Sequence, residues 1–294
     1  MFQISRPLVA AVDIDEGSHE TLRQAHDLAR SYNVELHVCH VLPEIFAVRP
    51  LFPHLHLEDA LNLAEFEAAV RGALLERIRM ATGREATQVS VAIEQGTVHA
   101  RILRIAEQVD AGAIVVGGKM DENRQPTLGE TAGPVVRYAH CPVLVARPSP
   151  EVTVLAATDF SDSSLPAVEA GATEARRRRA DLTIIHSVDL LSLMVPGSDA
   201  VSPGILRVDL SDQMMNAGRK RLDEAVHQFE AKGGGLLRSG APASAILSAA
   251  KELPAQLLVI GTHGRTGLRR LALGNVAEAV VRQAPCSILV VRLT

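Results

Sequence analysis

The chain repeats itself once along its length, and this repeat constrains the fold more than any other feature. Two apolar stretches end at Asp13 and Asp159, and two further apolar stretches end at His40 and His186. The two aspartates are 146 positions apart in the sequence, and so are the two histidines. A fixed period of this kind indicates that one structural unit occurs twice.

Three pairs of glycines and one longer segment continue the repeat. The segment at 139–147 (AHCPVLVAR) matches the segment at 284–292 (APCSILVVR). The glycine pairs, with offsets of 144, 144 and 145 residues, are Gly96 with Gly240, Gly117 with Gly261, and Gly129 with Gly274. The order is the same throughout, so we interpret the chain as a tandem duplication. Pro148 and Pro150 stiffen a short linker, which predicts domains at 1–147 and 151–294.

Within each half, apolar runs alternate with segments of helical period. In the second half we predict strands at 152–158, 182–187, 236–238, 257–260 and 287–291. The predicted helices lie at 165–179, 212–232, 244–252 and 276–283. Strands that are apolar along their whole length are typical of a parallel sheet covered on both faces. Right-handed crossovers then predict an α/β fold with two doubly wound domains of five strands each.

The composition excludes several classes of protein. Apolar residues make up 47% of the chain and aromatic residues only 3%, so aliphatic side chains must fill the cores. The net charge of −4 provides no general basic field for nucleic acid or an anionic membrane. One run of four arginines, Arg176–Arg179, is interpreted as a solvated helix end.

Cysteine usage and hydropathy bear on the compartment. The three cysteines form no CxxC pair, which favours a reducing environment and no structural metal site. Cys141 and Cys286 occupy matching positions and are expected to be buried. No uncharged apolar run reaches about 18 residues, so we expect a cytoplasmic protein without a membrane segment.

A glycine-rich stretch in the second half has the order expected of a phosphate-binding site. An apolar strand at 257–260 stops at Gly261, and Gly264 and Gly274 follow. Asn275 then opens an amphipathic segment, so the loop leads into a helix N-terminus that attracts anions. Asp159 ends the first strand, which flanks the same crevice in doubly wound sheets. Its carboxylate would bind ribose hydroxyls while the loop amides bind phosphates.

These motifs resemble the nucleotide-binding members of the universal stress protein family. The loop GTHGRTGLRRLALGN has the form G-x2-G-x9-G followed by a small polar residue, and TDFSDSS ends the first strand. The resemblance covers both halves and implies Rossmann-like domains of the adenine nucleotide alpha hydrolase type. It also implies a stress-response regulatory protein that binds ATP, with any Mg²⁺ carried in by the phosphates.

The resemblance assigns site residues position by position. Those expected to meet the nucleotide are Ala157, Thr158, Asp159, Ser187, Ile260, Gly261, His263, Gly264, Arg265, Gly274, Asn275 and Val276. The family usually has Ser or Thr where this chain has Asn275. The alternative for Asn275 is a helix-capping pair with Glu278. The alternative for Arg265 is a solvated loop, and His263 is expected to pack rather than to catalyse.

The first half departs from this pattern. Its loop, GGKMDENRQPTLGETAG, has Met120 in place of Gly264 and Glu130 in place of Asn275. Methionine adds bulk where a backbone must approach phosphate. The carboxylate of Glu130 would repel a phosphate at this place, since two like charges about 4 Å apart cost roughly 4 kcal/mol at an effective dielectric constant near 20. We therefore predict that the first half does not bind a nucleoside triphosphate.

No motif of a dedicated enzyme is present. The sequence contains no GxxxxGK[ST], GxSxG or HExxH, so we expect a binding protein with at most slow ATP hydrolysis. One alternative is a binder of an apolar or lipid-like molecule, lined by the loop-rich stretches 42–65 and 190–209. A second alternative is a scaffold without a ligand.

Two further expectations follow from the duplication. His40 and His186 are expected to make the same structural hydrogen bond in each half. The last strands, 143–145 and 288–291, are the candidate edges of a pseudo-dimer within one chain, since pairing removes exposed sheet edges. The sequence leaves open whether two chains then form a homodimer.

Overall fold

The structure, a computed structural model, describes residues 2–15, 17–42, 63–83, 89–120, 126–127, 129–149, 152–189, 205–262 and 273–292. The chain forms two compact units. One contains Ile4–Lys119 and Leu128–Arg147. The other contains Pro148–Thr294 together with Met1–Gln3 and Met120–Thr127. Most of the predicted repeat therefore appears as two separate cores.

The second half contains five parallel strands in the order β10-β9-β8-β11-β12. The strands are β8 (Thr153–Ala157), β9 (Asp181–Val188), β10 (Gly235–Ser239), β11 (Ala255–Gly261) and β12 (Ser287–Val291). The helices between them are α6 (Leu165–Arg178), α7 (Ile205–Gln228), α8 (Pro242–Glu252) and α9 (Asn275–Gln283). This arrangement confirms the predicted doubly wound α/β fold.

The first half has the same strand order, β3-β2-β1-β4-β7, and its strands are also parallel. These strands are β1 (Leu8–Ala11), β2 (Leu36–Leu42), β3 (Val89–Gln95), β4 (Ala113–Gly117) and β7 (Val143–Ala146). A separate two-stranded sheet joins β5 (Lys119–Met120) and β6 (Pro126–Thr127). The helices are α1 (Ser18–Tyr32), α3 (Leu63–Thr82), α4 (Val98–Gln108) and α5 (Ala132–Tyr138).

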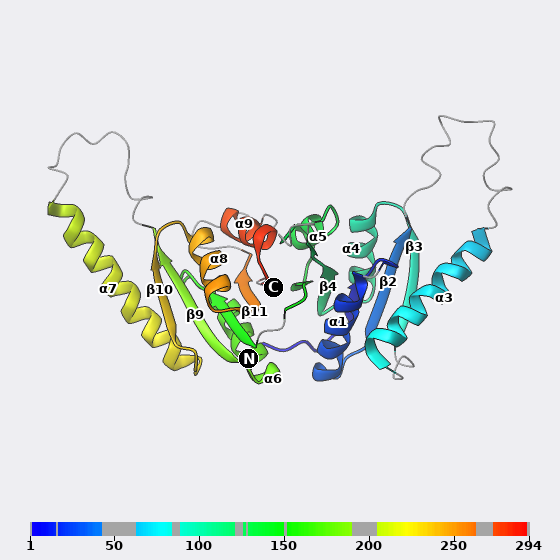
Figure 1. Ribbon diagram of the computed structural model, residues 1–294, viewed down its shortest axis with the longest axis horizontal. Coiled ribbons are helices and arrows are strands. Elements are labelled where there is room, and N and C mark those ends of the chain that lie inside the picture. Colours follow the sequence, from blue (N-terminus) through cyan, green and yellow to red (C-terminus); the bar gives the residue numbers. More distant parts are fainter. Residues whose placement is uncertain are drawn as a thin grey trace, which may run out of the picture. The chain divides into compact units, whose positions relative to one another are not determined.

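Helices cover both faces of each set of five strands (Figure 1). Helix α7 packs on β9 and β10, and α6 packs on β8, β9 and β11. Helices α8 and α9 contact each other, as do α4 and α5 in the first half. In each half, the direction in which strands are added to the sheet reverses after the third strand. Because the crossovers are all right-handed, the first two helices lie on one face of the sheet and the last two on the other. The core between the layers is almost entirely Val, Leu, Ile and Ala.

Helix α7 differs from its prediction at both ends. It begins at Ile205, seven residues before the predicted start at 212, and ends at Gln228 rather than at 232. The loop-rich stretch predicted at 190–209 was therefore wrong for its last five residues. Residues 190–204 lie outside the described residues, and so do 43–62 of the other loop-rich stretch. The first-half stretch also overlaps β2 at Leu42 and α3 from Leu63.

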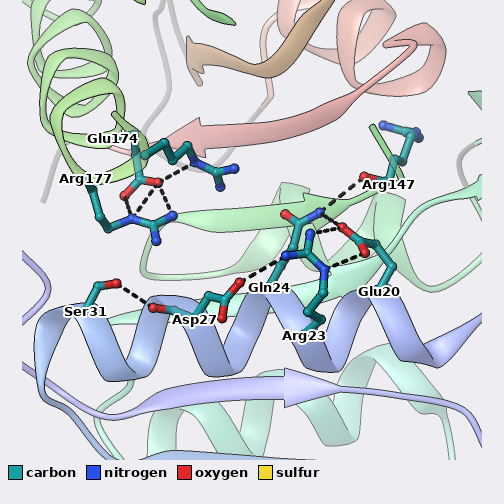
Figure 2. A network of polar contacts seen from close by, with 9 residues as sticks. Glu20, Arg23, Gln24, Asp27, Ser31, Arg147, Glu174 and Arg177 are labelled. Carbon is teal, nitrogen blue, oxygen red and sulfur yellow. Dashed lines mark hydrogen bonds and ion pairs between the residues drawn. The ribbon is translucent and has the colours of Figure 1, made fainter. Parts of the chain in front are cut away.

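The interpretation of the arginine run as a solvated helix end was wrong for two of its members. The guanidinium of Arg177 donates to both oxygens of Glu174, with Nη2 2.7 Å from Oε2 (Figure 2). Arg178 donates through Nε to the same carboxylate at 3.1 Å. Arg176 and Arg179 are exposed as predicted. Two charges of the run therefore neutralise a buried carboxylate.

All three cysteines are buried free thiols, which confirms the burial predicted for Cys141 and Cys286. Burial is the largest cause that raises the pKa of Cys39, to about 12. A thiol with such a pKa stays protonated and unreactive at neutral pH. Cys141 and Cys286 are likewise packed as small apolar side chains.

None of the helices in the described ranges is long and apolar enough to cross a membrane. Within the same ranges, no three His, Cys, Asp or Glu side chains gather into a group that would bind a metal ion.

Candidate functional site

The carboxyl ends of three adjacent strands form the base of the predicted site. Strand β8 pairs with β9 on one side and with β11 on the other. Because all three run parallel, Thr158, Ser187 and Gly261 come to the same edge of the sheet. The first and fourth strands of this half are neighbours, as expected where the strand order of a doubly wound sheet reverses.

The glycine-rich loop starts and finishes at this edge. The backbone N–H of Gly274 donates to the carbonyl of Thr262, with 2.9 Å between nitrogen and oxygen. The N–H of Thr262 donates to the carbonyl of Val291 at 3.0 Å. The predicted residues His263, Gly264 and Arg265 lie outside the described residues. The described ends show that the loop is closed at its base.

Helix α9 begins directly after this closure. Gly274 is the N-cap residue, in an extended conformation with ψ 151°, and Asn275 is the first helical residue. No described side chain caps the helix, and the N–H of Glu278 donates to the carbonyl of Gly274 at 2.8 Å. The alternative of an Asn275–Glu278 capping pair was therefore wrong, because such a pair needs Asn275 at the N-cap. The first-turn amides and the helix dipole remain suited to an anion.

The turn after β8 fixes Asp159 at the same edge of the sheet. Its carboxylate oxygen Oδ1 accepts hydrogen bonds from the backbone N–H of Ser161 at 3.0 Å and from its hydroxyl at 2.5 Å. Thr158 Oγ1 lies 2.9 Å from the hydroxyl of Ser164, the N-cap residue of α6. The turn is therefore tied to both the strand before it and the helix after it.

A buried histidine supports this turn from the neighbouring strand. Nδ1 of His186 donates to the carbonyl of Thr158 at 2.8 Å. In the first half, Nδ1 of His40 donates to the carbonyl of Val12 at 2.9 Å. Because a carbonyl only accepts, Nδ1 carries the proton in both rings. The predicted shared hydrogen bond is confirmed.

The other predicted residues lie around the same edge. The hydroxyl of Ser187 donates to the carbonyl of Gly240 at 2.7 Å, which joins the end of β9 to the turn before α8. Gly240 has a φ of 115°, a conformation that favours glycine. Ala157 and Ile260 are buried strand residues, so only their backbone would be available to the predicted ligand. Val276, on the first turn of α9, is exposed.

The corresponding edge of the first half is built differently. Helix α5 begins three residues after Gly129, whereas α9 begins one residue after Gly274. Helix α5 therefore lacks the two residues that correspond to the start of α9. Glu130 is exposed and lies before Thr131, the N-cap residue of α5. Met120 belongs to the short strand β5, where the second-half pattern has a glycine.

Three residues near the site were not predicted from the sequence. Thr262 provides the carbonyl that closes the loop, although its place directly after Gly261 was a usable signal. Phe160 lies between Asp159 and Ser161 with a positive φ of 61°. Arg221 reaches Phe160 from α7. Phe160 carries no sequence signal for this conformation, because phenylalanine rarely adopts it. Arg221 carries no sequence signal for its contact with Phe160 either.

Comparison with known proteins gives one family. The model of the universal stress protein family matches residues 5–147 and again residues 152–292. Universal stress protein Rv1996 of Mycobacterium tuberculosis is 27% identical, over 99% of this chain and 96% of its own length. Universal stress protein MJ0531 of Methanocaldococcus jannaschii is 32% identical, over 46% of this chain and 78% of its own length.

Solved structures show the same fold. A putative universal stress protein from Pseudomonas aeruginosa has a TM-score of 0.67 at 21% identity, over 98% of this chain and 93% of its own. A universal stress protein from Archaeoglobus fulgidus has a TM-score of 0.66 at 20% identity, over 98% and 96%. Both similarities extend over the whole tandem arrangement.

Proposed function

Because the chain belongs to the universal stress protein family, we propose that it binds an adenine nucleotide through its second half. The nucleotide would act as a regulatory ligand, ATP in the first instance, and not as the substrate of a dedicated enzyme. The protein would then respond to nucleotide by changing its conformation or its choice of partner.

One observation carries this proposal. The N–H of Gly274 closes the loop onto Thr262, and α9 starts at the next residue with no described side chain on its first-turn amides. Asp159 lies at the end of β8, beside β11, from which the loop departs. A carboxylate for ribose and an amide-rich helix start for phosphate therefore belong to neighbouring strands, the arrangement that doubly wound sheets use for nucleotides.

The structure of the first half supports a single site per chain. Its helix α5 starts later than α9, and Glu130 precedes the helix. A carboxylate at that place repels phosphate, and the two residues missing from the start of the helix leave fewer first-turn amides near the loop. We propose that the first half holds no nucleoside triphosphate and serves as a structural partner.

The proposal of binding without dedicated catalysis rests on the chemistry of the described residues. At the crevice, the carboxylate of Asp159 accepts from Ser161, and the imidazole of His186 is engaged with a backbone carbonyl. Both hydrogen bonds stabilise the turn after β8, so we assign these two side chains to structure and ligand binding rather than to catalysis. We expect any hydrolysis to be slow, and any Mg²⁺ to be held mainly by the phosphates.

The loop assignment is tested with Gly264→Val, and Met120→Val is its matched control. Valine at position 264 blocks the approach of the backbone to phosphate, so we expect ATP affinity to fall by at least about a hundredfold, which corresponds to about 2.7 kcal/mol. Met120→Val changes the corresponding first-half position and should leave affinity unchanged. Isothermal titration calorimetry measures both, and thermal unfolding verifies that each variant is folded. Unaltered ATP binding by folded Gly264→Val would show that the loop is wrongly assigned.

Acid extraction of the purified protein, followed by mass spectrometry, distinguishes the proposed ligand from the alternatives. An adenine nucleotide in the extract supports the proposal. A released lipid would instead support the alternative of a binder of an apolar or lipid-like molecule. The two loop-rich stretches expected to line that site, 42–65 and 190–209, lie largely outside the described residues. Release of no small molecule, together with no ATP binding by calorimetry, would support a scaffold.

A further inference from the structure

One residue beside the crevice has a backbone conformation that its position does not explain. Five described residues other than glycine have a positive φ. Four of them follow the ends of helices α1, α4, α6 and α7, where a left-handed residue commonly ends a helix. The fifth, Phe160, follows a strand and precedes a helix, with a φ of 61°. A β-carbon disfavours this conformation, so surrounding contacts must hold it.

Contacts from three elements hold Phe160 in place. Its backbone N–H donates to Oγ1 of Thr158 at 2.9 Å. Its ring packs on the imidazole of His186 from β9, with 4.4 Å between ring centroids and 46° between planes. The guanidinium carbon of Arg221, on α7, lies 5.1 Å from the centroid of the ring, and Nη2 of Arg221 donates to the carbonyl of Phe160 at 3.4 Å.

The conformation of Phe160 determines the direction of the chain between two predicted ligand contacts. Asp159 precedes it, and Ser161, which donates to the Asp159 carboxylate, follows it. If Phe160 moved to a negative φ, the N–H and hydroxyl of Ser161 would turn away from that carboxylate. The orientation of Asp159 at the crevice therefore depends on Phe160.

The first half provides an internal comparison. Ile14 occupies the position of Phe160 there, and it is not among the described residues with a positive φ. The left-handed turn thus occurs in the half that carries the intact glycine pattern. Backbone strain concentrates where a binding site requires a particular geometry.

We propose that Phe160 is a positioning residue for the nucleotide crevice. His186 and Arg221 hold its ring so that its backbone stays left-handed and directs Asp159 toward the ligand. This inference rests on the proposed function and adds to it a residue that does not itself touch the nucleotide. It also connects helix α7 to the crevice through Arg221.

The test compares Phe160→Ala with Phe160→Gly. Both variants remove the ring, but glycine adopts a positive φ freely and alanine does not. We expect Phe160→Ala to weaken ATP binding about tenfold, a size that follows from the cost of a left-handed alanine. Phe160→Gly should restore the affinity to within about twofold of the parent protein, as calorimetry would show. Equal losses in both variants, or no loss in either, would overturn the proposal.

Unfolding without nucleotide separates this inference from the proposed function. A residue held at a positive φ should make Phe160→Gly at least as stable as Phe160→Ala, the reverse of the usual order of the two residues. If the parent protein bound no ATP, the proposed function would fail, and this comparison would still decide whether Phe160 is strained. A clearly lower melting temperature for Phe160→Gly than for Phe160→Ala would show that the backbone of Phe160 is not strained.

Arg221→Met tests the contact from α7, and Arg219→Met on the same helix is its control. Arg221 is exposed, and a cation–π contact at an exposed site predicts a loss of about threefold in ATP affinity. The same substitution should have no effect when combined with Phe160→Gly, because glycine needs no support. Arg219→Met should leave affinity unchanged. A threefold loss that persists in the Phe160→Gly background would contradict the role given to Arg221.

Discussion

At the scale of single residues, burial decides what an ion pair is worth. Glu174 and Arg177 are three positions apart on α6, with 2.7 Å between nitrogen and oxygen, and their side chains are 2% and 16% exposed. Glu76 and Arg79 on α3 have the same spacing and the same distance, but are 52% and 64% exposed. Coulomb attraction strengthens as water is excluded, and so does the cost of leaving one charge unpaired.

We therefore expect Glu174→Gln to lower the free energy of unfolding by about 3 kcal/mol at pH 7, since two arginines would lose a buried partner. Glu76→Gln is the matched control and should change stability little, because water solvates both partners. Urea unfolding followed by circular dichroism measures both variants. A loss for Glu174→Gln no larger than that for Glu76→Gln would show that the buried pair adds nothing.

The same carboxylate makes stability depend on pH. Burial, the largest single influence, raises the pKa of Glu174, but the bonds and charges of Arg177 and Arg178 together lower it below its ordinary value of 4.5. A carboxyl whose folded pKa is lowered stabilises the fold above its unfolded pKa, and this contribution disappears as pH falls through the folded pKa. The stability difference between the parent protein and Glu174→Gln should thus be full at pH 7 and shrink below about pH 4.5. A difference that stayed constant across this range would contradict this assignment.

At the scale of elements, close packing of α6 on the sheet depends on a glycine. A β-carbon on Gly171 would lie 2.8 Å from the β-carbon of Ala156 on β8, closer than two carbons approach. Gly72 on α3 has no atom within 4 Å of its would-be β-carbon, among the described residues. The two helices therefore tolerate an added methyl group very differently.

Gly171→Ala should destabilise the protein by about 1–3 kcal/mol, because a helix backbone would have to move away from a strand. Gly72→Ala should stabilise it by about 0.5–1 kcal/mol, because alanine loses less conformational entropy in a helix. Thermal unfolding of the two variants measures the opposite signs. Two changes of the same sign would show that α6 does not approach the sheet as closely as described.

Elements were predictable where one physical signal dominated. The strands β9 and β11 were found because near-continuous apolar runs need burial on both faces. The start of α7 was missed because Pro203 and Gly204 were interpreted as continuing a loop, although such residues also precede a helix directly. The buried state of Glu174 and the left-handed Phe160 were not predictable, since both depend on neighbours that the sequence does not place together.

At the scale of the whole molecule, the duplication makes the chain its own control. Both halves have the same strand order and the same histidine hydrogen bond to the residue that follows the first strand. They differ at the carboxyl edge of the sheet, where the second half has a glycine loop closed at its base and a left-handed Phe160. The shared features are explained by the fold, and the differences support the proposed ligand site in one half. How the two last strands are arranged, and whether chains associate, stay predictions.

The central claim, one nucleotide site per chain located in the second half, is tested most directly by the stoichiometry of ATP binding. Isothermal titration calorimetry of the full chain, freed of any bound nucleotide beforehand, gives this number without further assumptions. We expect one equivalent of ATP per chain. Two equivalents would contradict the inactive first half, and none would contradict the proposed function itself.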